Sequence, residues 1–289
     1  MGILSNIIID GLIYGILLFM IAVGLSITMG LMRFVNLAHG VFAMLGGYIT
    51  IVFINDMGMP WIVGVVLAIA AVSLGSIPLE RFLISRVYNR TALDQVLLTI
   101  GLTFISISLV SLMFGTRMSA IPLPEILSGS LDVGFRTMPA QRILVIAAGI
   151  LVFFGLWLLI EKTTFGIRLR AAVDHPATAS AVGINTRVVA TAAFALGAGM
   201  AALGGIVGSS LMPIEPFYPL KYMVLFLAVV AVGGLGSLAG TLASALVLGM
   251  IDTATKYVAP ELSSILFFLA IISIISLRPN GLFGRGLHV

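Results

Sequence analysis

The chain lacks cysteine altogether and has few charged residues. None of its 289 residues is Cys, and only 9% are Asp, Glu, Lys or Arg. The absence of cysteine excludes disulfide bonds, thiol nucleophiles and thiolate metal sites. The shortage of charge excludes an ordinary soluble domain, in which about 25% of the residues are charged. Lipid must therefore cover most of the surface.

Several enzyme and cofactor motifs are also missing. The sequence has no Walker A pattern, so we expect no P-loop for ATP, and it has no HExxH or GxSxG motif. Its three histidines, His39, His175 and His288, fall in separate turns or tails. We therefore expect no catalytic residue, no metal site and no cofactor bound by this chain.

What the chain has instead is long apolar runs, and 60% of its residues are hydrophobic. Each membrane-spanning helix needs about 20 mostly apolar residues. We place the runs at 7–29, 38–55, 61–79, 93–115, 139–160, 187–210, 221–235, 239–257 and 262–277. The first is too long for the apolar region of a signal peptide, so we interpret it as the first span. The runs predict an all-α fold, a polytopic membrane helix bundle in a single domain over 1–289.

The seventh run, 221–235, is short, and Gly-Gly-Leu-Gly occupies positions 233–236 at its end. A half-helix that turns back inside the protein fits this pattern, provided that its backbone is buried. We therefore expect eight or nine transmembrane segments, with broken or re-entrant helices as an alternative to full spans.

Basic residues in the loops predict the orientation. Ten Lys and Arg residues fall on one side of the nine-span arrangement and four on the other (Arg33, Arg81, Arg86, Arg90, Lys162, Arg168, Arg170, Arg187, Arg278 and Arg285 against Arg117, Arg136, Arg142 and Lys221). Cytoplasmic loops carry the excess of Lys and Arg. The C-terminus and the 161–186 loop are therefore expected inside the cell. The net charge of +4 reflects this bias, and we expect no nucleic-acid partner.

Small residues recur at helical spacing within the runs. GxxxG pairs occur at Gly11 and Gly15, at Gly204 and Gly208, and at Gly236 and Gly240. Small residues four apart share one helix face and allow two backbones to approach closely. Static packing and sliding helix contacts are both compatible with the pattern.

A few polar residues lie within or beside the apolar runs. Thr99, Thr103 and Ser106 share one helix face, where they line a polar pathway or bond to their own helix backbone. Asn36 and His39 come at the start of an inner helix, where Asn36 is placed to cap it or to contact a solute.

Three charged residues lie near the outer ends of two runs. Asp10 falls near the start of the first run, and Asp252 lies four residues before Lys256 near the end of the eighth, close enough to pair with it. We interpret all three as interfacial residues, although an intramembrane acid such as Asp252 could instead serve an ion-coupled carrier.

The longest inner loop differs from the other loops. Five alanines follow Arg170 between 168 and 182, and Pro176 is the only proline in that stretch. Because proline suits the first position of a helix, we predict a short amphipathic helix that begins near Pro176.

Several stretches resemble the permeases of branched-chain amino acid ABC transporters. The matching sequences are RFVNLAHG at 33–40 with GGY at 46–48, TFGIRLRA at 164–171, GGLGSLAG at 233–240 and RPNGLFG at 278–284. They span almost the whole chain in the family order. The length is similar to that of the shorter of the two permeases in such systems.

The resemblance implies a multi-subunit importer in the bacterial inner membrane. It implies a second homologous permease, two cytoplasmic ATPases that bind ATP and Mg²⁺, and a periplasmic solute-binding protein. It also implies that the loop at about 161–186 is the coupling helix that docks on an ATPase, and we assign Arg170, Asp174, Pro176, Ala177, Ala181 and Gly183 to that contact.

The sequence leaves the solute and the class of transporter open. The resemblance implies branched-chain amino acids or related amides and carboxylates, and few polar groups are candidates to hold a zwitterion. A stand-alone ion-coupled secondary transporter and an integral membrane enzyme remain as alternatives. The enzyme would need an intramembrane catalytic cluster, and we find none in the sequence.

Overall fold

The apolar runs form long helices in the computed structural model, which describes residues 3–32, 34–132, 137–278 and 281–283. The elements long and apolar enough to cross a membrane are α1 (Ile3–Met32), α2 (His39–Ile51) with its π-helical extension η1 (Val52–Asp56), α3 (Trp61–Phe82), α4 (Ala92–Phe114), α6 (Ala140–Lys162), α9 (Thr186–Val207), α11 (Leu238–Val258) and α12 (Ser263–Leu277) with the 3-10 turn η3 (Pro260–Leu262). These eight spans in the described chain confirm the predicted polytopic helical bundle.

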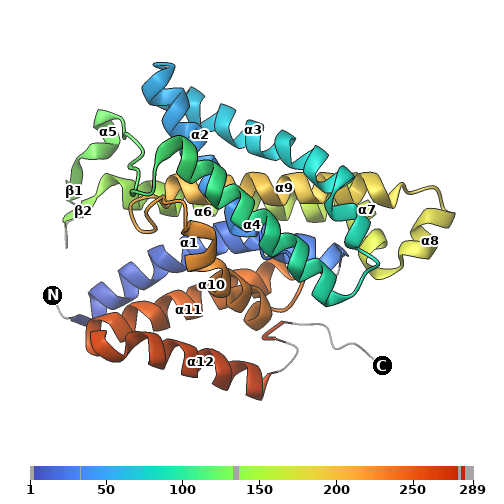
Figure 1. The fold of residues 1–289 in the computed structure, drawn as a ribbon. Helices are drawn as coiled ribbons and strands as arrows, with labels where there is room; N and C mark the ends of the chain where they lie inside the picture. The colour runs from blue at the N-terminus through green and yellow to red at the C-terminus, as the bar shows by residue number, and fades with distance from the viewer. Residues whose placement is uncertain (1–2, 33, 133–136, 279–280, 284–289) are drawn as a thin grey trace.

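Short elements lie at the two ends of the bundle. One end carries α5 (Glu125–Ser128) and a hairpin of β1 (Ser130–Asp132) and β2 (Thr137–Pro139), in which Leu131 lies opposite Met138. The other end carries α7 (Thr164–Asp174) and α8 (Pro176–Ala181). Figure 1 shows the two groups at opposite ends of the long helices. These two groups therefore lie at opposite ends of the bundle, which is the arrangement that the loop charges predict.

Two helices form the centre of the bundle. About 61% of the most apolar part of α1 is buried and 67% of α9, against 22% for α4 and 11% for the last span. The central helix α1 packs against α9, α10 (Tyr218–Gly233) and α11. The peripheral helices α3, α4, α6 and α12 leave large apolar side chains exposed, as lipid or a membrane partner requires.

Glycines allow the central helices to approach one another closely. A Cβ atom on Gly15 would lie 2.8 Å from the backbone of Ala245 and Leu246 on α11. Gly24 of α1 and Gly197 of α9 meet in the same way, because a Cβ on Gly24 would lie 2.4 Å from the Gly197 carbonyl oxygen. Glycine therefore packs α1 against both α9 and α11.

The other glycines singled out in the sequence lie at similar contacts, with one difference. Gly11 faces Met250, and Gly204 and Gly208 face Ile21 and Leu17 of α1; Gly208 lies just after the last residue of α9. Gly236 is not on a helix face: its φ of +75° puts it in the turn before α11, beside Gly30 of α1, while Gly240 lies in the first turn of α11. The spacing of four between Gly236 and Gly240 therefore comes from a turn followed by a helix.

The seventh apolar run forms a short helix that starts among buried residues. Helix α10 has 16 residues and begins at Tyr218 and Pro219, both buried. A Cβ on Gly40, at the start of α2, would lie 3.0 Å from the Cα of Pro219. Helix α2 itself begins beside the middle of α1, where the His39 Nε2 lies 2.9 Å from the Ile21 carbonyl oxygen. The starts of α2 and α10 thus meet within the bundle.

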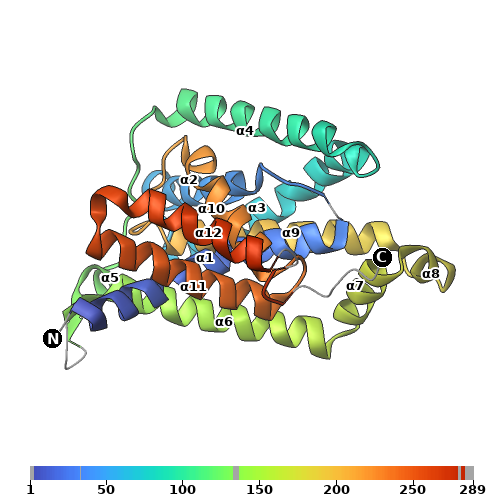
Figure 2. The ribbon, with the colours of Figure 1, turned by 90° about the horizontal axis from the view of Figure 1, so that it is seen from below.

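Helix α4 lies along one side of the molecule, and Figure 2 shows it apart from the ribbons of the other helices. The element whose backbone lies closest to that of α4 is η2 (Ile84–Val87), the 3-10 turn that precedes it. A single buried stripe made of Gln95, Thr99, Thr103, Ile107 and Val110 faces the bundle. Helix α4 is therefore joined to the bundle by side chains along one face and by the polypeptide at its first turn.

Candidate coupling loop and translocation pathway

The loop between α6 and α9 contains two helices. The predicted helix near Pro176 is confirmed, because α8 begins at Pro176 with the proline in its first turn. Helix α7, over 164–174, was not predicted. A helix start was nonetheless readable in the sequence, since the side chain of Thr163 caps α7 by accepting a hydrogen bond from the Gly166 N–H.

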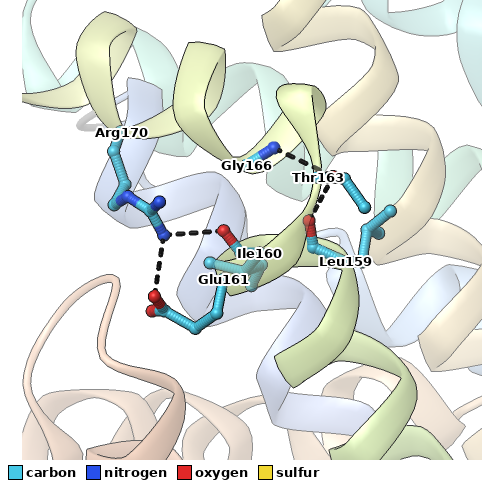
Figure 3. Close-up of polar contacts among 6 residues, drawn as sticks. All are labelled: Leu159, Ile160, Glu161, Thr163, Gly166 and Arg170. Atoms are coloured by element: carbon cyan, nitrogen blue, oxygen red, sulfur yellow. Dashed lines mark hydrogen bonds and ion pairs between the residues drawn. The ribbon is translucent and has the colours of Figure 1, made fainter.

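The corner between α6 and α7 is held by a compact set of hydrogen bonds, shown in Figure 3. The Thr163 hydroxyl lies 3.3 Å from the Gly166 nitrogen and donates to the Leu159 carbonyl at 2.5 Å. Gly166 packs against the end of α6 so closely that a Cβ there would lie 1.9 Å from the Ile160 carbonyl oxygen. A larger residue at 166 would therefore open the corner.

Arg170 completes this corner. Its Nη1 donates to the Ile160 carbonyl at 2.6 Å and lies 3.3 Å from Oε2 of Glu161. The guanidinium thus binds the C-terminal end of α6, where a cation also interacts favourably with the helix dipole. Arg170, which the sequence analysis assigns to the contact with an ATPase, is thus engaged within the chain, because α7 folds back toward the end of α6, and its side chain remains 39% exposed.

Helix α8 presents small side chains to the solvent. Asp174, Pro176, Ala177, Ala181 and Gly183 are all exposed. Ala179 is buried, at 3% exposure, and α8 packs against α7 and α9. Beside the alanines, Val182 is 71% exposed. The exposed face of α8 is therefore small, partly apolar and accessible to a docking protein.

The chain turns sharply from α8 into α9. Gly183 has a φ of +89°, a conformation that L side chains rarely adopt. Two residues later, the Asn185 side chain accepts a hydrogen bond from the Val188 N–H and caps α9. Gly183 therefore has a backbone role in addition to its exposed position.

Asn36 and His39 occupy buried positions at the start of α2. The Asn36 Oδ1 accepts a hydrogen bond from the Ala38 N–H at 3.1 Å, so Asn36 forms a turn ahead of the helix and the N-cap residue is Ala38. His39 is 2% exposed and bonds the Ile21 carbonyl. Within the described residues, the Asn36 Nδ2 has no hydrogen-bond partner. The structure thus brings the two residues together but buries both.

Thr99, Thr103 and Ser106 share one face of α4, but their hydroxyls bond to their own helix. Thr99 donates to the Gln95 carbonyl at 2.9 Å, and Thr103 to the Thr99 carbonyl at 2.8 Å. Ser106 likewise donates to the Leu102 carbonyl at 2.8 Å. Of the two expected roles, bonding to their own helix backbone is therefore the one seen here, because each hydroxyl reaches a carbonyl one turn earlier.

Charged residues gather around a pocket at the end of the bundle that carries α5 and the β hairpin, which the loop charges predict to be the outer end. The predicted pairing of Asp252 with Lys256 is confirmed at 2.5 Å, and the Lys256 ammonium lies 5.2 Å from the ring centre of Tyr14. A second pair, which the sequence did not reveal, joins Asp10 to Arg142 at 2.5 Å. The pocket has a volume of about 280 Å³. Each acid in it is neutralised by a basic partner from the same outer end.

One buried carboxylate was missed by the sequence analysis. Glu80, in the last turn of α3, is 2% exposed and accepts hydrogen bonds from the Tyr88 hydroxyl at 2.6 Å and the Thr191 hydroxyl at 2.7 Å. Burial and the neighbouring carboxylate raise the pKa of Tyr88, so its hydroxyl remains a donor. In the sequence Glu80 falls one residue beyond the apolar run at 61–79, so the run gave no sign of a buried acid.

Within the described ranges, no three His, Asp or Glu side chains come together in a way that could hold a metal ion.

Comparison with known proteins gives matches along nearly the whole chain. Residues 7–275 match the family described as "Branched-chain amino acid transport system / permease component". The chain is 28% identical to the high-affinity branched-chain amino acid transport system permease protein LivH of Salmonella typhimurium and to that of Escherichia coli, over 96% of this chain and 94% of each relative. It is 25% identical to the corresponding protein BraD of Pseudomonas aeruginosa, with the same shares covered.

Proposed function

The chain belongs to the permease components of branched-chain amino acid transport systems, and on that premise we propose that it is a transmembrane subunit of an ATP-binding-cassette importer. In this role it forms part of the translocation pathway for a small solute. The relatives are named as branched-chain amino acid permeases, so we propose that the solute is a branched-chain amino acid or a related amide or carboxylate.

The observation that carries the proposal is the α7–α8 loop, which lies at one end of the bundle of apolar helices. An importer needs an element that receives force from the ATPases. Helix α8 has an exposed small-residue face at Ala177 and Ala181, and it leads through Gly183 directly into the central helix α9. Arg170 and Gly166 brace the loop against α6, so a push on α8 is transmitted to the bundle.

We propose that the partners are a second, related permease, two cytoplasmic ATPases and a periplasmic solute-binding protein. ATP and Mg²⁺ would bind the ATPases, because this chain has no P-loop motif. The exposed apolar faces of α4 and α12 are suited to a membrane neighbour, either lipid or the second permease. The site of action would be the bacterial inner membrane, with the α7–α8 loop in the cytoplasm, as the loop charges predict.

The polar groups of the chain favour this proposal over a stand-alone ion-coupled carrier. Such a carrier needs an ionisable group that binds and releases an ion within the membrane. Asp252 and Asp10 are each paired with a basic residue at the outer end. Glu80 is held by two hydroxyls at the opposite end, in the last turn of α3.

Reconstitution tests the proposal. The chain would be purified with the subunits encoded beside it and placed in liposomes with ATP inside and a loaded binding protein outside. We expect uptake of leucine, isoleucine or valine that requires ATP and the binding protein. Uptake by the isolated chain, driven by a proton or sodium gradient without ATP, would overturn the proposal in favour of the carrier. Recovery of a homodimer that transports solute without other subunits would contradict the proposed set of partner subunits.

A further inference from the structure

Glu80 connects three segments of the chain that are distant in sequence. It lies on α3, and its two carboxylate oxygens accept hydrogen bonds from Tyr88, in the segment between η2 and α4, and from Thr191 on α9. Both bonds are short, at 2.6 and 2.7 Å. Among the described residues, Glu80 has no cationic partner within ion-pair distance. A buried carboxylate without a cation depends on its hydrogen bonds, so these two hydroxyls hold the three segments together.

Thr191 connects Glu80 to the coupling loop. It is 6% exposed and lies in the second turn of α9, whose first residue, Thr186, follows α8 by only a short turn. The Thr191 hydroxyl shares its one hydrogen between Glu80 and the Arg187 carbonyl, which lies 3.0 Å away and one turn nearer to the loop. Any displacement of α8 that moves the start of α9 therefore moves Thr191.

Tyr88 connects Glu80 to α4. Its ring packs edge-on against Phe34, with 5.5 Å between the ring centres. The Gln95 Nε2, in the first turn of α4, lies 3.3–3.4 Å from the carbonyl oxygens of Val87, Tyr88 and Arg90, which share its two hydrogens. The Gln95 Oε1 also accepts a hydrogen bond from the Val35 N–H at 3.2 Å. Gln95 is 5% exposed, so this end of α4 is fixed to the 84–90 segment and to the chain ahead of α2.

We propose that Glu80 is a positioning residue that transmits movement of α8 and α9 to α4 through Thr191 and Tyr88. This inference rests on the proposed function, because it takes the α7–α8 loop as the element on which the ATPase acts. Helix α4 suits such a role, since it lies at the side of the bundle and its backbone is closest to that of η2. A movement delivered at its first turn would shift the whole helix as a unit.

Three substitutions separate transmission from simple support of the fold. Thr191→Val and Tyr88→Phe each remove one hydroxyl and keep the shape of the side chain. Glu80→Gln keeps an oxygen that accepts from one hydroxyl and offers an amide to the other. Thr50→Val is the matched control, because Thr50 is equally buried and bonds only the Gly46 carbonyl of its own helix. All four would be made in the complete transporter with its ATPases.

The first readout is the number of solute molecules transported per ATP hydrolysed. We expect Thr191→Val and Tyr88→Phe to lower this ratio about tenfold, within the usual range of coupling between distant sites. The ATPases should still copurify and still hydrolyse ATP, because the α8 surface is intact. Glu80→Gln and Thr50→Val should stay close to wild type.

The second readout is the movement of α4 itself. Cysteines at Leu112 on α4 and Leu262 in η3, both exposed, would carry spin labels in the cysteine-free chain. In the wild-type complex we expect ATP to change the distance between the labels, and in Thr191→Val we expect that change to be lost. A residue that only supports the fold would lower the yield of the complex and leave this change intact.

The outcomes are distinguishable. Wild-type transport ratios and distance changes in both Thr191→Val and Tyr88→Phe would overturn the proposal, as would an α4 distance that does not respond to ATP in the wild type. If transport falls only as much as the amount of folded complex falls, then Glu80, Tyr88 and Thr191 serve stability alone. That result would also overturn the proposal. Failure of the wild-type chain to copurify with any ATPase would instead contradict the proposed function itself.

Discussion

Asp10 on α1 and Arg142 on α6 form an ion pair at the outer end of the bundle, with 2.5 Å between Oδ1 and Nη1. Their side chains are only 15% and 24% exposed, so water screens the pair weakly. The two residues are 132 positions apart in the chain, and the pair joins the first span to the helix that leads into the α7–α8 loop.

Breaking this pair should destabilise the outer end. We expect Arg142→Ala to lower the free energy of unfolding by about 1–3 kcal/mol, because it leaves a largely buried carboxylate with fewer donors. Lys256→Ala is the control: its ammonium is 57% exposed, and the loss should be below about 1 kcal/mol. Thermal unfolding of the purified protein in detergent measures both. If the two substitutions lower the free energy of unfolding equally, then burial does not make the Asp10–Arg142 pair stronger than the Asp252–Lys256 pair.

Single-cysteine labelling tests the orientation. A cysteine at Ser130 in β1 should react with a membrane-impermeant reagent in intact cells, and one at Thr178 in α8 should react only after the cells are opened. Thr178 is the better inner position, since the neighbouring Ala179 is buried and would label poorly on either side. Because the native chain has no cysteine, the background is nil. Labelling of Thr178→Cys in intact cells would reverse the topology.

A bulky residue on α8 should block docking of the ATPase. Ala181→Trp fills a small exposed surface, and overpacking a close contact typically costs about 1–3 kcal/mol. We expect normal expression and intact binding of solute to its receptor, but loss of solute-stimulated ATP hydrolysis. Ser128→Trp, equally exposed but on α5 at the opposite end, is the control. Gly183→Asp should also abolish transport, but its φ of +89° means that strain contributes.

If Ala181→Trp transports at the wild-type rate, α8 is not the coupling element. The loop that carries Arg81, Arg86 and Arg90 would then be the next candidate, because it lies at the same end of the bundle and is joined to α9 through Glu80.

Close packing of α1 should not tolerate even one methyl group. We expect Gly24→Ala to destabilise the protein by about 1–3 kcal/mol, since its Cβ would lie 2.4 Å from the Gly197 carbonyl oxygen. Gly101→Ala on α4 is the matched control, because nothing lies within 4 Å of the Cβ position. Alanine there should be neutral or stabilise by up to about 1 kcal/mol through helix propensity. Thermal unfolding in detergent again provides the measurement, and a neutral Gly24→Ala would show that the two helices can separate at no cost.

The parts of the structure that depend on local sequence could be predicted. The apolar runs predicted the transmembrane helices, because lipid imposes a minimum length on every helix that crosses it. Pro176 marked the start of α8, and the spacing of Asp252 and Lys256 indicated their pair. Each of these features is decided by residues within a few positions of one another.

The parts that depend on distant contacts could not be predicted. Arg170 is assigned from the sequence to the contact with an ATPase, but its bonds to Ile160 and Glu161 arise only from the way α7 folds back on α6. Glu80 was not singled out from the sequence, because only the packing of α3 against α9 brings Thr191 to it. Spacing in one sequence does not reveal which helices pack together, so partners more than a few turns apart remained hidden.

The length of α1 has a further consequence for how the protein sits in lipid. Its 30 residues extend about 45 Å at 1.5 Å per residue, while the hydrocarbon layer is about 30 Å thick. A helix that exceeds the layer tilts or thickens the bilayer around it. Because α9 and α11 meet α1 through glycines with no side chain between the backbones, they must follow any change in its tilt. Acyl-chain length is therefore a variable that should alter transport by this protein even when every subunit and ligand is present.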